Sequence, residues 1–397
     1  HGIDVFGRST TQPGGFRSIP LAETLLGLGV SAAIFAPGWT YECEDGKESR
    51  DKFRGNAMKF WTPTAAGTLP YRSLPSLTPG QEPIHLTFGE GCGDGMWSGG
   101  KRLSERPWND LRQQGIAVGG MGTLLPILTF PATEEGEELP WSAAVNFDDA
   151  YEGGSCLLVE CATDTIAPGE FSVFSLCSFS ASSAAVTFPI VVTLVTSSDG
   201  GLGAALVLED QEKQLYLLGE QSTADSLAAT LLFAFLTSPG PPLLPRPSGS
   251  RLVAGSDRDW RETAFRFTPS AAISRLLLVT TALPSLPSGR ASVWVGAASI
   301  GPALAVPCTH PELLRSITMT SPPSHITTET SVVISWEQTT ALRSVDVWLQ
   351  RNDGTLTWAA RCCRGFLVPT SASVTAVRLT WRGHCGCEGR VTQRLPQ

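Results

Sequence analysis

The chain has no long run of basic residues and no long run of apolar ones. Its 29 Lys and Arg are outnumbered by 37 Asp and Glu, which gives a formal net charge of −8. Proteins that bind nucleic acid or an anionic membrane surface present a basic patch, so this composition argues against both partners. No stretch approaches the roughly 20 uninterrupted apolar residues that a membrane-spanning helix needs. The longest apolar stretches, near Leu227–Leu236 and Leu276–Val279, have the length of strands.

The chain also lacks the paired cysteine spacing of a disulfide framework. Its ten cysteines are scattered singly except near the end, which in a chain of 397 residues favours reduced thiols. Cys362-Cys363 and Cys385-Gly386-Cys387 could in principle supply four thiolates to a zinc ion. Adjacent cysteines bind one metal poorly, however, and no histidine spacing supports the site. We therefore predict no metal and no cofactor.

Two common catalytic motifs are missing as well. The glycine-rich stretch Gly89–Gly95 lacks the Gly-Lys-Ser/Thr ending of a phosphate-binding loop. Of the histidines, His85 lies in a strand-like run, and His310, His325 and His384 lie in β-like regions without a nucleophile motif. A Ser-His-Asp triad is therefore not expected.

The N-terminal forty residues carry the most informative pattern. Short apolar runs, Gly2–Phe6 and Ser31–Ala36, each end in polar and aromatic residues, and the apolar helix-like segment Ile19–Leu28 lies between them. Both runs have the character of parallel strands buried on both faces, and a (β/α)8 barrel keeps its active site at the C-terminal ends of such strands. The chain starts inside the first strand, at His1. We therefore predict that residues 1–125 form the C-terminal portion of a TIM barrel whose N-terminal strands are missing.

Two further segments extend this α/β pattern. The stretch between Tyr41 and Leu69 has helix-like apolar spacing. Ile84–Phe88 is predicted as a third strand of the barrel series, followed by the glycine-rich stretch. Several prolines between the two predict an irregular connection.

The remainder of the chain is predicted to be all-β. Residues 126–140 are acidic and linker-like, and residues 141–310 contain many short Val-, Leu-, Phe- and Thr-rich runs separated by turn residues, as in a β-sandwich of the jelly-roll, carbohydrate-binding type. Residues 311–397 resemble an immunoglobulin or fibronectin-III-like domain, with Trp336 expected in its core and a turn at Asn352–Gly354. The predicted class is therefore multidomain α/β plus all-β.

An ordered set of segments resembles glycoside hydrolase family 85, the cytosolic endo-β-N-acetylglucosaminidases. The set covers most of residues 1–160 and consists of Gly2–Arg8, Gly14–Phe16, Phe35–Glu42, Leu86–Gly93, Pro107–Leu111 and Ala150–Val159. Beyond about residue 200 only the architecture is similar.

The resemblance implies hydrolysis of the GlcNAc-β-1,4-GlcNAc core of N-glycans by a retaining, substrate-assisted reaction. The substrate's 2-acetamido oxygen attacks the anomeric carbon, one Glu acts as general acid and then base, and an Asn orients the acetamide. A nucleophile already held near the reacting carbon has a very high effective molarity, so one proton-transferring carboxyl group suffices. The resemblance further implies that the substrates are N-linked glycans or free oligosaccharides of the high-mannose type. It also implies that the protein is a monomer located in the cytosol.

The family's catalytic Asn and Glu are separated by one residue, and this spacing is absent here. The four asparagines, Asn56, Asn109, Asn146 and Asn352, are followed two positions later by Met, Leu, Asp and Gly. We assign no catalytic residue, expect the pair upstream of His1, and expect the chain alone to be inactive.

Candidate substrate-binding residues therefore come from strand ends. Trp and Phe rings can stack on the apolar faces of sugars, while carboxylates and guanidinium groups bind hydroxyls. The candidates are Asp4, Phe6, Arg8, Phe35, Trp39, Tyr41, Glu42 and Phe88.

A rival hypothesis keeps the chain non-catalytic. The β-sandwich of residues 141–310 would then bind carbohydrate or another protein. A purely structural adhesion protein fits the tandem β domains but not the aromatic residues at the N-terminal strand ends.

Overall fold

A computed structural model gives the structure of the chain. It describes residues 1–8, 14–42, 46–68, 75, 77–79, 83–114, 127–129, 140–180, 188–220, 223, 242–303, 314–320, 331–338, 342–362, 365–369, 374–383 and 388–395. The chain divides into two compact units. The first comprises His1–Leu77, Ile84–Arg102 and Arg106–Ile300, and the second comprises Thr78–Pro83, Leu103–Glu105 and Gly301–Gln397.

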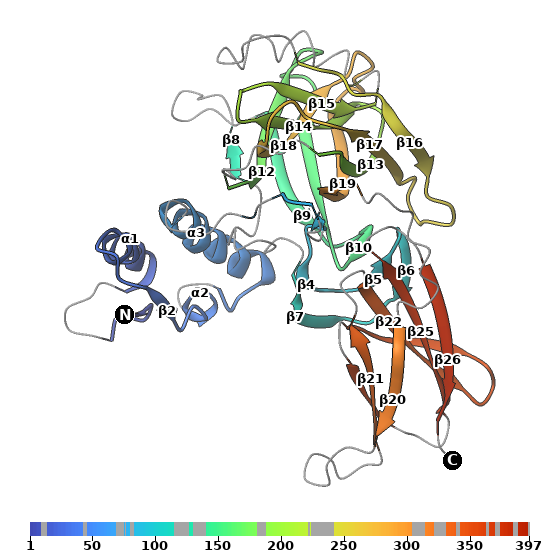
Figure 1. Ribbon diagram of the computed structural model, residues 1–397. Helices are drawn as coiled ribbons and strands as arrows, with labels where there is room; N and C mark the ends of the chain where they lie inside the picture. The colour runs from blue at the N-terminus through green and yellow to red at the C-terminus, as the bar shows by residue number, and fades with distance from the viewer. Residues whose placement is uncertain are drawn as a thin grey trace. The chain divides into compact units, whose positions relative to one another are not determined.

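The first unit begins with the predicted strand–helix–strand pattern. Strand β1 pairs in parallel with β2, with Ile3 opposite Ile34. Pro20 lies in the first turn of the intervening helix α1, where its missing N–H costs no hydrogen bond, and Gly29 follows the helix end in a left-handed conformation (φ 73°). Figure 1 shows these elements in blue. They are β1 (Gly2–Asp4), η1 (Gly15–Ser18), α1 (Ile19–Gly27), β2 (Ala33–Phe35), α2 (Trp39–Glu42) and α3 (Arg50–Thr68).

The burial of these two strands differs from the prediction. Ile3 is fully buried, but Ala33 is exposed and Phe35 is 60% exposed. The expectation that both strands are buried on both faces is therefore wrong for β2, because only Ile34 of that strand is partly covered.

The third predicted barrel strand has a different partner. β3 (Ile84–Leu86) pairs antiparallel with β19 (Arg290–Pro302), with Leu86 opposite Ala298. In this structure β3 therefore extends the β-sandwich, and its assignment as a third strand of the barrel series is wrong. The physical reason is burial: Ile84 and Leu86 belong to the apolar core of the sandwich.

The glycine-rich stretch after β3 forms small antiparallel sheets. β4 pairs with β7, and β5 lies between β10 and β6. Their bounds are β4 (Glu90–Gly93), β5 (Met96–Ser98), β6 (Lys101–Ser104), β7 (Trp108–Gln114) and β10 (Glu152–Gly153).

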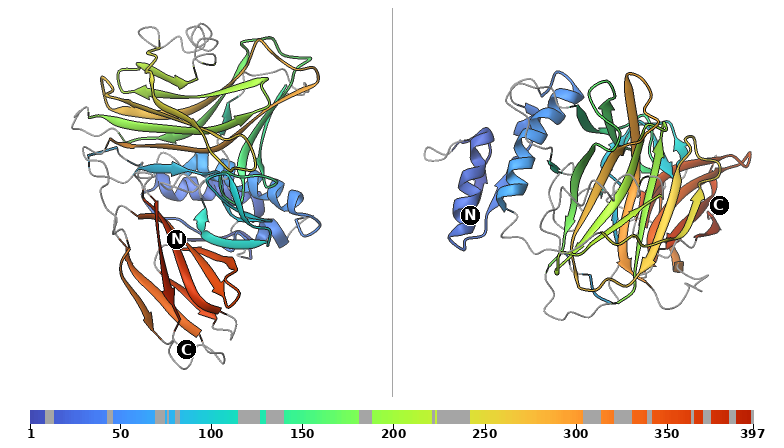
Figure 2. Two further views of the ribbon diagram at one scale, coloured as in Figure 1. Left: turned by 90° about the vertical axis from the view of Figure 1, so that its right-hand side faces the viewer. Right: turned by 90° about the horizontal axis from the view of Figure 1, so that it is seen from above.

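Most of the first unit is a sandwich of two antiparallel sheets, as the short β-rich runs predicted (Figures 1 and 2). One sheet has the order β16-β17-β13-β19-β11-β9, with β3 also on β19, and the other has the order β15-β14-β18-β12-β8. The bounds are β8 (Ile127–Thr129), β9 (Trp141–Asn146), β11 (Cys156–Ala162), β12 (Phe171–Ser178), β13 (Ile190–Ser198), β14 (Leu202–Asp210), β15 (Leu215–Gly219), β16 (Pro247–Leu252), β17 (Arg261–Phe267) and β18 (Ile273–Ala282).

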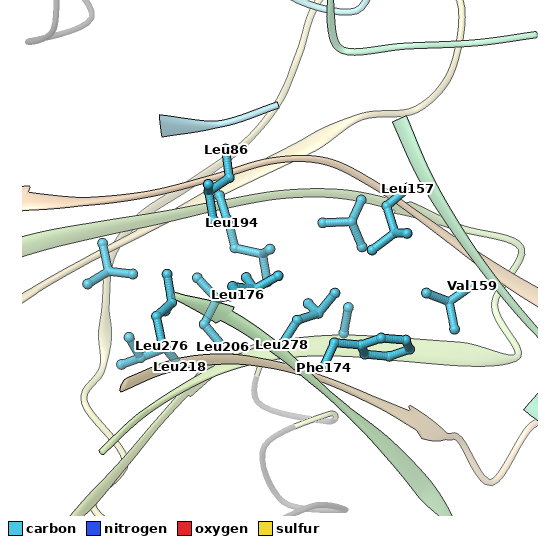
Figure 3. Packing of buried hydrophobic residues seen from close by; sticks show 14 of the residues in the cluster. Leu86, Leu157, Val159, Phe174, Leu176, Leu194, Leu206, Leu218, Leu276 and Leu278 are labelled. Atoms are coloured by element: carbon cyan, nitrogen blue, oxygen red, sulfur yellow. The ribbon is translucent and has the colours of Figure 1, made fainter. Parts of the chain in front are cut away.

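The core lies between the two sheets. Side chains alternate along each strand, so every second residue points inward. Figure 3 shows the resulting layer, in which Leu157, Val159 and Leu194 from one sheet face Phe174 and Leu206 from the other.

One sheet is apolar on both faces. All nine residues of β14 and all five of β15 are buried. Ala205, Val207 and Leu277, which alternate with the residues of the central core, belong to a second apolar cluster. A two-sheet sandwich requires only one apolar face per sheet. Because the residues on the other face of this sheet are buried as well, that outer face is also covered.

The second unit contains two further antiparallel sheets, ordered β20-β21-β24 and β23-β22-β25-β26. Gly354 has a φ of 82° in the predicted turn after β22. The side chain of Trp336, expected in this core, lies outside the described residues. The bounds are β20 (Leu314–Thr320), β21 (Ser331–Gln338), β22 (Leu342–Arg351), β23 (Leu356–Cys362), β24 (Gly365–Pro369), β25 (Val374–Gly383) and β26 (Glu388–Arg394).

Within the described part of the chain, free thiols are found at Cys156, Cys161 and Cys177. This agrees with the prediction of reduced thiols for these three residues. Burial raises the pKa of Cys161 to about 11 and that of Cys177 to about 12, so both stay protonated at neutral pH. Most of the linker 126–140 and the candidate zinc ligands Cys363, Cys385 and Cys387 lie outside the described residues. None of the helices in the described ranges has the length and apolarity to span a bilayer.

The central core predicts a large difference between two leucines. Leu206 is fully buried in the sandwich, whereas Leu252 on β16 is 58% exposed. Leu206→Ala should lower the free energy of unfolding by about 2–5 kcal/mol, because it removes buried apolar surface and leaves a cavity. Leu252→Ala, the matched control, should change it by about 0.5 kcal/mol or less. Urea denaturation followed by circular dichroism measures both, and equal losses would contradict this assignment of the core.

Candidate functional site

A charged pair lies at the C-terminal end of β1. Arg8 Nε donates to Asp4 Oδ2 at 2.8 Å, and Arg8 Nη2 donates to Asp4 Oδ1 at 3.0 Å. The backbone N–H of Phe6 also donates to Asp4 Oδ1, at 3.1 Å. This two-pronged arrangement fixes the plane of the guanidinium group as well as its position. It therefore presents the remaining Arg8 donors in a defined direction.

Two aromatic rings accompany the pair. Arg8 Cζ lies 5.1 Å from the centroid of the Phe6 ring and 5.8 Å from that of Phe35. Both distances fall within the range of cation–π attraction. Because β1 and β2 are parallel and adjacent, their C-terminal ends meet, which brings Phe35 to Asp4. We call Asp4, Phe6, Arg8 and Phe35 the Arg8 cluster.

The Arg8 cluster is charged and open to solvent. The hydrogen bonds that Asp4 accepts from Arg8 lower the pKa of Asp4 below its ordinary value. Asp4 in turn raises the pKa of Arg8, and the nearby Glu42 makes a smaller contribution in the same direction. Asp4 is therefore an anion at neutral pH and has no proton to donate. The cluster can bind and orient hydroxyl or amide groups, but Asp4 is unsuited to act as a general acid.

Close backbone contacts hold the turn after β1. Gly7 adopts a left-handed conformation (φ 64°), and the N–H of Gly15 donates to the Val5 carbonyl at 2.6 Å. A Cβ atom at Gly14 would lie 2.7 Å from the backbone nitrogen of Gly7. Only glycine permits this approach, so the Gly14-Gly15 pair fixes the position of the chain that carries Arg8.

Trp39 and Tyr41, the two aromatic residues of α2, each pack against a phenylalanine ring that the sequence did not single out. Trp39 makes an edge contact with Phe16, with ring centroids 4.9 Å apart, and its ring lies against Gly15. Tyr41 makes an edge contact with Phe53 of α3 at 5.6 Å. Phe16 directly follows Gly14-Gly15, and this position in the sequence was the signal that could have identified it as a packing partner. Tyr41 remains 50% exposed, whereas Trp39 is partly buried.

Phe88 is not part of this site. Its side chain is 2% exposed and belongs to the core of the sandwich. Its carbonyl accepts a hydrogen bond from the Ser155 hydroxyl at 3.1 Å. A ring buried in this way cannot stack on a sugar, so its assignment as a substrate-binding residue is wrong. The structure thus brings together Asp4, Phe6, Arg8 and Phe35, with Glu42 nearby, and gives Trp39 and Tyr41 packing partners on η1 and α3.

Within the described ranges no group of three or more His, Cys, Asp and Glu side chains could hold a metal ion. The expectation that the protein needs no metal or cofactor stays a prediction.

The fold resembles that of a glycoside hydrolase domain. The glycoside hydrolase domain of Endo-D from Streptococcus pneumoniae R6 matches 92% of this chain with a TM-score of 0.54 and 15% sequence identity, and the match covers 53% of that chain. At this identity the likeness concerns the fold alone.

The sequence comparisons find similarity to one family of glycoside hydrolases. Residues 1–94 match the model of glycosyl hydrolase family 85. The cytosolic endo-beta-N-acetylglucosaminidase of Gallus gallus is 35% identical over 170 residues, which is 43% of this chain and 20% of that protein, and the Homo sapiens protein of the same name is 31% identical over 163 residues, or 40% and 19%. The predicted relationship to family 85 is confirmed. The aligned part spans about a fifth of these curated relatives.

The Asp4–Arg8 pair predicts a defined titration. In ¹³C NMR of Asp-labelled protein, Asp4 should titrate below the ordinary aspartate range, with Asp4→Asn identifying its signal. Because the folded-state pKa is lowered, the stabilisation from the pair is complete at neutral pH, where the carboxyl is ionised in both states. It is lost only as the pH falls through the folded-state pKa, in the acid range. Arg8→Gln should return the pKa toward its ordinary value, whereas Arg17→Gln, an exposed control on η1, should not. An Asp4 titration that ignores Arg8→Gln would show that the pair is not formed in solution.

Proposed function

We propose that this chain is the substrate-binding portion of an endo-β-N-acetylglucosaminidase that cleaves the GlcNAc-β-1,4-GlcNAc core of N-glycans. The observation that carries the proposal is the Arg8 cluster, which lies at the C-terminal ends of two parallel strands within the segment that matches family 85. Barrel enzymes keep their active sites at this end of their strands.

The cluster suits a carbohydrate more than a charged ligand. The Phe35 ring is exposed and offers an apolar face to the C–H surface of a sugar. Since Asp4 already neutralises Arg8, the pair offers acceptors and donors for hydroxyl groups without a net charge. A neutral oligosaccharide is therefore the best match.

The proposed reaction is substrate-assisted and retains the anomeric configuration. The acetamide oxygen of the substrate attacks its own anomeric carbon, so the protein must orient that group and transfer one proton. The Asn-x-Glu pair that would do so does not occur among the 397 residues. In this proposal the residues present here bind the glycan, and the chain by itself does not hydrolyse it.

The remaining assignments are proposals of the same kind. Residues 1–125, except Ile84–Leu86 of β3, would belong to a TIM barrel, residues 141–310 to a jelly-roll sandwich and residues 311–397 to an immunoglobulin-like domain. The curated relatives are named cytosolic, which supports the cytosol as the location. The substrates would be N-linked or free oligosaccharides of the high-mannose type, and the protein would be a monomer that binds neither nucleic acid nor membranes.

The rival proposal is a non-catalytic protein that binds ligands through the sandwich. The partly buried Trp294, stacked 3.8 Å from Arg258 Cζ on this unit, is the observation that favours it. The two proposals differ in where a glycan binds.

Binding and hydrolysis of one substrate test both proposals. The full chain should bind a fluorescently labelled high-mannose glycan with an intact chitobiose core, measured by anisotropy, and should release no product on chromatography. Phe35→Ala should weaken binding about ten-fold, or about 1.4 kcal/mol, because it removes the exposed ring. Leu28→Ala, which truncates a side chain that is 73% exposed, is the matched control and should leave the affinity unchanged.

Each alternative outcome is distinct. Product formation by this chain would overturn the proposed need for an Asn-x-Glu pair. Binding that survives Phe35→Ala but is lost with Trp294→Ala would favour the sandwich. No measurable binding by the folded chain would contradict the first proposal and would leave the rival only as a protein-binding sandwich.

A further inference from the structure

One sheet of the second unit has an outer face unlike an ordinary solvated β-sheet. In the sheet β23-β22-β25-β26 (Figure 1), Val345, Val347, Val377 and Leu379 lie on the inner face and form the core of this unit. The alternating residues therefore point to the opposite face. That face carries tryptophan and arginine where serine, threonine and lysine would suffice for solubility.

These side chains form one row across all four strands. Trp348 of β22 lies opposite Trp358 of β23 on one side and opposite Arg378 of β25 on the other, and Arg378 lies opposite Thr392 of β26. Neighbouring strands are about 4.8 Å apart. The two indole side chains therefore start from adjacent strands at the same height, and both are partly exposed.

Hydrogen bonds along the face fix both indoles. Trp348 Nε1 donates to Thr380 Oγ1 at 3.0 Å, and Trp358 Nε1 donates to Asp346 Oδ1 at 3.2 Å. Asp346 is 6% exposed although it lies on the outer face of the sheet. Because both N–H groups are used within the sheet, what the rings offer outward is apolar ring surface in a fixed orientation.

The rest of the face offers hydrogen-bond donors and positive charge. Arg378 Nε is buried and finds no hydrogen-bond partner among the described residues. Arg390 and Arg394 of β26 alternate with the core-facing Val391 and are exposed. Among the side chains described on this face the only carboxylate is the buried Asp346. A basic face on a chain of net charge −8 is a local feature that composition does not explain.

We propose that this face, defined by Trp348, Trp358, Arg378 and Arg390, is a carbohydrate-binding site for an oligosaccharide that carries a carboxylate group. Sugar rings stack on the two fixed indoles, and the acidic group of the ligand pairs with the arginines. Because the two rings are already held in place, they lose little conformational entropy when a ligand binds, and this favours stacking. The site does not depend on the proposed function of the Arg8 cluster, which lies in the other unit.

A matched pair of ligands tests the proposal on the full chain. The probes are a sialylated biantennary N-glycan and the same glycan after removal of its sialic acids, with affinities measured by isothermal titration calorimetry. The sialylated form should bind at least ten-fold more tightly, and this preference should shrink as salt is added. Arg390→Glu should reduce affinity for the sialylated form at least ten-fold and remove the preference. Trp348→Leu should weaken both forms.

Controls separate the site from the fold and from overall charge. Arg246→Glu makes the same charge change at an exposed position of the first unit and should leave both affinities unchanged. Circular dichroism checks folding; if Trp348→Leu unfolds the unit, Arg390→Glu decides, because its side chain is exposed. Failure of both glycans to bind, equal affinity for the two, or binding that Arg390→Glu leaves intact would overturn the proposal.

Discussion

Burial of alternating apolar side chains between two sheets is the constraint on which the first unit depends. Leu206 and Phe174 are completely buried, and the strands that carry them pair with β18 at the centre of their sheet. Burial also explains why β3 pairs with β19 and is not part of the predicted barrel series, because Ile84 and Leu86 pack into the apolar core of the sandwich. Apolar burial is non-directional, so it selects any strand with the right alternation, whatever its neighbours in sequence.

The N-terminal strands follow a different rule. β1 and β2 are three residues each, and β2 is largely exposed, so hydrogen bonds and close backbone contacts define the site more than burial does. The Asp4–Arg8 pair is held by its own geometry, by the turn at Gly7 and by two phenylalanine rings. This arrangement keeps Asp4 ionised at neutral pH, so its carboxyl group has no proton to donate.

Glycine determines where several tryptophans can lie. A Cβ atom at Gly15 would lie 2.7 Å from the Trp39 ring, and one at Gly389 would overlap the Trp381 ring. In both cases the ring occupies the space that a side chain would need. The indoles of Trp348 and Trp358 are instead fixed by hydrogen bonds to Thr380 and Asp346. Large aromatic side chains are thus held in fixed orientations by close contact with glycine in both units, and by hydrogen bonds in the second unit.

The sequence alone determined the local elements and the relationship to family 85. The period of apolar residues predicted α1, β1, β2 and most sandwich strands, since that period depends only on local geometry. Residues 1–94 match the model of that family. Which strands pair and which side chains are buried was decided only by the tertiary structure. In it Phe88 lies in the core, Phe35 lies close to Arg8, and Trp348 lies opposite Trp358. Pairing between distant strands depends on packing across the whole core, and no short window of sequence contains that information.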